Sequence, residues 1–219
     1  MDLLRVEFDI HHIAVLSRKS PEEHALIRFI ISTLATPEET ENFVKKDLRV
    51  IKKNDKRIYT VKLTSGRKTR ISPLDKKTYE ILLQISKKKR NKERVFKFTR
   101  KQIDEIIKKY SPPGRKYDFK KLRDAVIRIL KDCIFFNEDY VKYFIEGTNF
   151  NKVLDFVYDF HPLYSGMWDL DDDEVAEDFI ADFTKYTGIT DVRKIAEIIG
   201  ECENRIKKLI NNHFKKSII

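Results

Sequence analysis

The residues of this sequence best suited to chemistry are three cations beside a predicted tight turn. Residues 60–63 and 69–71 are typical of short strands, and Ser65-Gly66 between them favours a turn. The turn places Arg67, Lys68 and Arg70 at the tip of a hairpin. Guanidinium and ammonium groups presented in this way suit phosphate oxygens.

The charge of the chain is strongly divided along the sequence. Its 219 residues carry a formal net charge of +10, from 45 Lys and Arg and 35 Asp and Glu. Residues 45–131 hold 31 of the bases and 9 of the acids, and the remainder holds 14 bases and 26 acids. A basic central region suits a polyanion such as nucleic acid. The alternative is a lysine-rich solvated surface of the kind found in thermophile proteins.

Metal and membrane sites find no support in the sequence. Cys133 and Cys202 lack metal-ligand spacing and lie in apolar helical contexts, so we expect buried thiols. The histidines also lack ligand spacing, and we expect neither a metal nor a cofactor. Without a signal peptide or an apolar run long enough to cross a bilayer, the sequence predicts a cytoplasmic, nucleoid-associated protein with no membrane partner.

Capping signals and apolar spacing predict a mainly α protein with a small antiparallel β-sheet, of the α+β class. Ser20, Thr36, Asp75, Thr99 and Asp191 each precede a predicted helix. The predicted helices run from 21 to about 34, from 37 to about 44, from 76 to 85, from 100 to about 107, over 119–131, 137–146 and 149–160, and from 192 to about 210. The predicted strands cover 49–53, 57–63 and 69–71.

Two domains are predicted, one over residues 1–165 and an acidic helical extension over 166–219. The extension opens with residues 169–182, which hold eight acids and no base. This stretch could cover a partner subunit or fold back on the basic face and compete with DNA. We also expect a homo-oligomer formed through the C-terminal helices.

The order of elements from 21 to 160 resembles the catalytic domain of tyrosine recombinases (phage-type integrases and Xer-like proteins). Four segments carry the resemblance: 42–48 at a helix–strand junction, 66–74 as the lysine hairpin, 119–125 as the box that opens a helix with Leu-Arg, and 147–158 as the segment ending in a tyrosine. The resemblance implies that residues 1–165 form a recombinase-like, DNA-binding domain.

The family uses a tyrosine to attack a DNA phosphate, which forms a 3′-phosphotyrosyl link. Arginines clamp the phosphate oxygens, a lysine protonates the leaving 5′-oxygen, and histidines assist proton transfer. The resemblance assigns the lysine role to Lys68, the second arginine to Arg123 and the nucleophile to Tyr158. Tyr143 and Tyr164 are the substitutes if the alignment shifts.

Three positions depart from the family pattern. Thr36 stands in place of the first arginine, Lys120 in place of the first histidine, and Thr148 in place of the second. The resemblance therefore implies an impaired or absent activity. Simpler interpretations also exist, because Thr36 is a good helix cap and Tyr158 lies in an apolar helical stretch where a core aromatic is common.

We therefore expect a double-stranded DNA-binding protein with an integrase-like fold, catalytically impaired or inactive, in an architectural or regulatory role. The predicted DNA contacts are Arg67, Lys68, Arg70, Lys87, Lys88, Lys89, Arg90, Arg100, Lys101, Arg115, Lys116, Lys120, Lys121 and Arg123.

Two alternatives remain open at this point. The first is an active recombinase in which Arg28 or Arg115 replaces the missing clamp. The second is a protein-interaction module in which the acidic extension and the last amphipathic helix mediate assembly.

Overall fold

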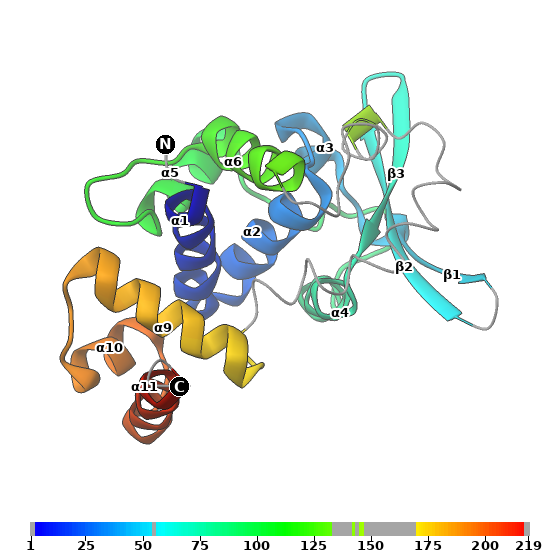
Figure 1. The fold of residues 1–219 in the computed structure, drawn as a ribbon. Helices are drawn as coiled ribbons and strands as arrows, with labels where there is room; N and C mark the ends of the chain where they lie inside the picture. Colours follow the sequence, from blue (N-terminus) through cyan, green and yellow to red (C-terminus); the bar gives the residue numbers. More distant parts are fainter. Residues whose placement is uncertain (1–2, 54–55, 133–141, 143–144, 147–169, 217–219) are drawn as a thin grey trace.

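The structure is a computed structural model that describes residues 3–53, 56–132, 142, 145–146 and 170–216 (Figure 1). The predicted helices 137–146 and 149–160 fall almost wholly outside these residues. Tyr143, Thr148, Tyr158 and Tyr164 lie outside them too, as does Cys133.

The prediction of a mainly helical chain with one small antiparallel sheet is confirmed. The sheet has three strands in the order β1-β2-β3, with both pairs antiparallel. The strands are β1 (Leu48–Lys53), β2 (Lys56–Ser65) and β3 (Lys68–Leu74). The helices are α1 (Leu3–Leu16), α2 (Pro21–Thr33), α3 (Pro37–Asn42), α4 (Lys76–Ile85), α5 (Arg100–Lys109), α6 (Phe119–Asp132), α9 (Asp173–Thr187), α10 (Val192–Ile199) and α11 (Glu203–Lys216), with short 3-10 helices η1 (Ser17–Lys19) and η2 (Lys45–Asp47).

Local capping chemistry starts several helices where the sequence predicts them. The Thr36 side chain accepts from the Glu39 amide, and the Asp75 side chain accepts from the Thr78 amide. Thr99 caps α5 in the same way. Ser20 precedes α2 as predicted, but its side chain forms no capping hydrogen bond.

The main core is built around α2, which is buried along most of its length between α1, α4, α6 and the sheet. A second core joins α9, α10 and α11 to Phe8 and Val15 of α1. Helix α1, which was not among the predicted helices, therefore contributes to both cores. The predicted domain boundary at 165/166 falls outside the described residues and stays a prediction.

The C-terminal helices pack on α1 and lie at the opposite end of the molecule from the sheet (Figure 1). Asp171, in the acidic stretch, pairs with Lys77 and Arg18 rather than with the hairpin cations. Among the described residues, therefore, the acidic stretch does not cover the hairpin tip.

Two details of the C-terminal helices correct the sequence analysis. The predicted single helix from 192 to 210 is broken after Ile199, because Gly200 adopts φ +79° and ends α10. Cys202 lies in the link between α10 and α11, where it is exposed. The prediction of a buried thiol is therefore wrong for Cys202, since the break removes it from the apolar helical face.

Candidate nucleic-acid interface

The tip of the β2–β3 hairpin is held by the first turn of α3. Both Glu38 carboxylate oxygens accept hydrogen bonds, one from the Ser65 hydroxyl at 2.5 Å and one from the Gly66 amide at 2.9 Å. Gly66 has φ +55°, a left-handed conformation that glycine adopts without strain. The brace leaves Arg67 and Lys68 exposed, and neither forms an ion pair with a described residue.

Arg70 does not share that exposure. It lies on the same face of β3 as Lys68, two residues further in, where the turn 33–39 covers it. Its Nε donates to Glu39 Oε1 at 2.7 Å, and its Nη2 donates to Glu39 Oε2 at 3.0 Å and to the Thr33 carbonyl at 3.1 Å. The guanidinium therefore ties β3 to the α2–α3 turn and is engaged inside the protein.

Glu39 links this ion pair to the start of α3. Burial raises its pKa, but the hydrogen bonds and charge of Arg70 outweigh that effect, so the pKa is lowered overall. The carboxylate also accepts from the Thr36 amide at 2.7 Å, while the Thr36 hydroxyl accepts from the Glu39 amide at 3.2 Å. Thr36 is thus occupied as a helix cap.

Arg123 lies on the other side of the same turn. Its Nε donates to the Leu34 carbonyl at 2.9 Å, and burial followed by the nearby charge of Arg70 lowers its pKa. The fold therefore brings the predicted positions Thr36 and Arg123 to one turn, beside the hairpin that carries Lys68. Lys120, at the start of α6, is exposed.

A second basic segment runs from 87 to 101. Lys45 Nζ donates to the carbonyls of Lys87 and Lys89 at 3.1 and 3.3 Å, which holds the segment beside η2. Arg100 and Lys101 occupy the first turn of α5, where the positive end of the helix dipole disfavours cations. An external anion would relieve that repulsion. The predicted contacts Lys87, Lys88, Arg90, Arg100, Lys101, Lys116, Lys120 and Lys121 are exposed, and Lys89 is half-buried.

The two arginines considered as replacement clamps are both engaged in ion pairs. Arg28 is buried, with its Nη2 3.0 Å from Asp75 Oδ1, and its Nε donates to Thr78. Arg115 Nε lies 2.6 Å from Oδ2 of the fully buried Asp9. Both arginines therefore stabilise the fold through these ion pairs, away from the hairpin tip.

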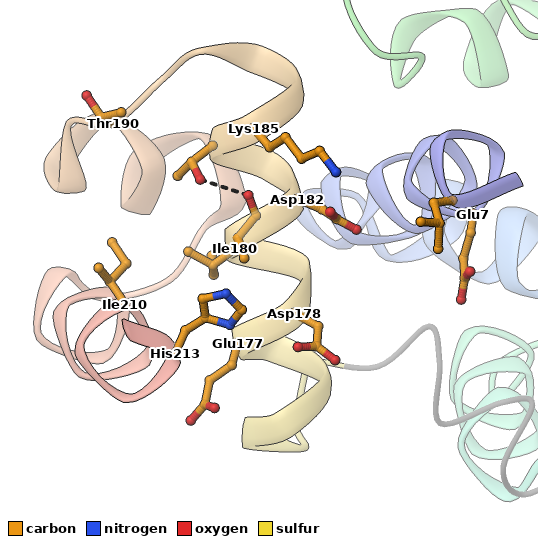
Figure 2. A pocket seen from close by; sticks show the side chains of 12 residues that line it. Glu7, Glu177, Asp178, Ile180, Asp182, Lys185, Thr190, Ile210 and His213 are labelled. Carbon is orange, nitrogen blue, oxygen red and sulfur yellow. Dashed lines mark hydrogen bonds between the residues drawn. The ribbon is translucent and has the colours of Figure 1, made fainter. Parts of the chain in front are cut away.

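The structure also contains a pocket of about 650 Å³ between α1, α9 and α11 (Figure 2). Apolar side chains such as Leu4 and Ile180 alternate with the carboxylates of Glu7, Asp178 and Asp182. Burial, followed by the charges of Asp182 and Asp178, raises the pKa of Glu7. This negative lining disfavours a polyanion, so the pocket is not part of the nucleic-acid interface.

We expect Glu7→Gln to stabilise the protein slightly at neutral pH, by at most about 1 kcal/mol. A carboxyl with a raised pKa stabilises the fold at low pH and loses that contribution as pH rises through the folded pKa. The gain should therefore shrink as the pH is lowered toward 4. Chemical unfolding of both proteins at several pH values measures it, and a gain that does not change with pH would contradict the assignment.

The fold and surface define a mainly helical protein with a braced basic hairpin. The chain matches no protein-family model. A relative described as an uncharacterized protein of Archaeoglobus fulgidus is 46% identical over 219 residues, which cover 100% of this chain and 97% of the relative. The chain belongs to the same family as that archaeal protein.

Among solved structures, the chain is similar to the XerH site-specific recombinase bound to a palindromic difH substrate in a post-cleavage complex. The TM-score is 0.45 and the sequence identity 17%, over 76% of this chain and 52% of the XerH chain. The match thus spans about half the length of XerH, and likeness of this degree does not assign the chain to the recombinases.

Within the part of the chain that the structure describes, no helix is both long and apolar enough to span a membrane. Nor do the described His, Cys, Asp and Glu side chains form a group of three that could hold a metal ion.

Proposed function

We propose that this protein binds double-stranded DNA without cleaving it, through a recombinase-like domain in an architectural or regulatory role. The observation that carries the proposal is the β2–β3 tip, where Arg67 and Lys68 are exposed while Glu38 fixes the turn between them and β2. Because the backbone of the turn is already fixed, only the two side chains lose conformational freedom when they contact phosphates. Residues 87–101 and 116–121 carry further exposed cations.

The contacts of Thr36, Arg28 and Arg115 support the view that DNA binding is not followed by DNA cleavage. Thr36 stands where the recombinases carry an arginine, and its hydroxyl is taken up in the helix cap. Arg28 and Arg115 are held by Asp75 and Asp9. Removing one donor that stabilises a transition-state oxyanion costs roughly a hundredfold or more in rate.

We expect Arg67→Ala with Lys68→Ala to weaken binding to a DNA duplex by about tenfold at moderate salt. Each lost phosphate contact also removes about 0.9 from the slope of log K against log salt, so the slope should fall by about 2. Native gel shifts over a salt series measure both quantities.

The matched control replaces Lys194 and Lys207, two exposed lysines of the C-terminal helices, with alanine. This variant loses the same charge and should keep both the affinity and the slope within about twofold of the original. Equal effects of the two variants would show that net charge alone drives binding and would count against a site at the hairpin.

The absence of cleavage is tested on the same samples. A nicked duplex releases a short 5′ fragment after attack and so traps any covalent intermediate. We expect a native shift with no adduct on a denaturing gel. A denaturant-resistant adduct that disappears in Tyr158→Phe would overturn the non-catalytic part of the proposal.

A further inference from the structure

The three-stranded sheet has a second basic end, formed by the β1–β2 ribbon. Arg49, Lys52 and Arg57 are exposed there, and none forms an ion pair with a described residue. The ribbon and the β2–β3 tip lie at opposite ends of the sheet, because β2 runs the whole length between them (Figure 1).

The strand register places two of these cations directly against each other. Lys52 of β1 pairs with Arg57 of β2. Like charges at directly opposed positions destabilise a β ladder, and an anion that contacts both would remove the repulsion. The arrangement therefore favours a ligand with closely spaced negative charges.

The ribbon is anchored on the protein rather than free to move as an isolated hairpin. Tyr59 of β2 packs against Tyr79 of α4 with ring centroids 4.8 Å apart. Strand β2 is also paired on both sides, with β1 over residues 56–61 and with β3 over residues 59–65. The distance between the two basic ends is thus set by a stiff strand.

That distance is shorter than one repeat of the DNA duplex. Lys68 lies opposite Ser65, which is eight residues along β2 from Arg57, so at about 3.3 Å per residue the two ends are roughly 26 Å apart. One turn of B-DNA measures about 34 Å. Phosphates of one strand follow at about 3.4 Å along the axis, so the two ends of the sheet are about eight base pairs apart.

We infer that Lys52 and Arg57 form a second phosphate contact on the same DNA duplex, about eight base pairs from Arg67 and Lys68. This inference rests on the proposed function and adds to it a contact site and a spacing. The sheet then acts as a spacer whose ends touch the DNA backbone at two points.

The test compares Lys52→Ala with Arg57→Ala against the Lys194→Ala, Lys207→Ala control and the Arg67→Ala, Lys68→Ala variant. On a duplex of about 24 base pairs, we expect the ribbon variant to bind about tenfold more weakly and its salt slope to fall by about 2. The side chains are exposed and repel each other, so the variant should unfold at the same denaturant concentration as the original protein or a higher one.

A short DNA distinguishes a second contact from a general loss of charge. A stem of about six base pairs spans only about 20 Å, so it cannot reach both ends of the sheet. On this stem the ribbon variant and the original protein should differ by less than about twofold, because either end can bind alone.

The outcomes separate the two claims. If the ribbon variant matches the lysine control on the long duplex while the tip variant is weakened, the second contact is wrong and the proposed function stands. If DNA binding by the ribbon variant is weakened equally on both DNA lengths, the inferred distance between the two contacts is wrong. A wild-type protein that does not shift the long duplex overturns the proposed function, and the inference falls with it.

Discussion

Replacing Glu39 with alanine is expected to lower the free energy of unfolding by about 3–5 kcal/mol, the cost of removing one partner of a buried ion pair. Glu39 and Arg70 are only 6% and 7% exposed, so the substitution removes the carboxylate that the Arg70 Nε and Nη2 contact and leaves this buried guanidinium near the charge of Arg123. It also removes the acceptor of the Thr36 amide. Denaturant unfolding followed by circular dichroism measures the loss.

The neighbouring Glu38 provides the matched control, since it lies in the same first turn of α3 but is exposed. We expect Glu38→Ala to cost less than about 1 kcal/mol, because exposed contacts of this kind add little stability. The double variant Glu39→Ala, Arg70→Met should recover part of the loss, because it also removes the buried positive charge that Glu39 balances. A single Glu39 variant as stable as the Glu38 variant would contradict a structural role for the pair.

Mild acid is expected to destabilise the protein by several kcal/mol through its buried histidines. Burial is the first cause that lowers the pKa of His11 to about 3 and of His12 and His24 to about 4, from 6.5. A lowered pKa means that the unfolded state takes up protons first. Stability is therefore complete above about pH 6.5 and is lost as pH falls toward 4, by about 1.4 kcal/mol per pH unit for each histidine.

The positions of His11 and His12 predict which part of the protein loses its packing first in mild acid. His11 packs on Phe179 with centroids 4.5 Å apart, and His12 stacks on Phe183 at 6.0 Å. Both contacts join α1 to α9, so protonation should weaken the packing of the C-terminal helices first. Hydrogen exchange at pH 7 and pH 5 can follow this region separately from the sheet.

The variant His12→Leu isolates the effect from other titrating groups. Glu7 and Asp9 have raised pKa values and act in the opposite direction, so the raw pH dependence is a sum. The variant should reduce the slope between pH 6.5 and 4 by about 1.4 kcal/mol per pH unit. An unchanged slope would mean that His12 takes up its proton at the same pH in the folded and unfolded states.

Much of the helix and strand pattern follows from the sequence because its causes are local. The hydroxyl of Thr36 and the carboxylate of Asp75 cap helices through contacts three residues away. Gly66 similarly favours a hairpin turn whatever the fold of the rest of the chain. The mainly helical class with a small antiparallel sheet could be predicted from such signals together with apolar spacing.

The roles of the arginines could not be predicted, because they depend on partners far away in the chain. Arg70 meets Glu39, and Arg115 meets Asp9. Seen in the sequence, both residues are ordinary members of a basic region. Only packing distinguishes these two arginines from Arg67 and Lys68, which stay exposed.

The basic centre, the acidic C-terminal stretch, the capped helices and the tight turn that presents Arg67 and Lys68 can all be predicted from the order of the amino acids. Only the packing of distant segments shows which cations face solvent, that α1 joins two cores, and that two basic ends of one sheet lie roughly 26 Å apart. The reason is the distance along the chain over which each interaction acts. Hydrogen bonds over three or four residues leave a local pattern, whereas burial and ion pairing depend on which distant segments meet.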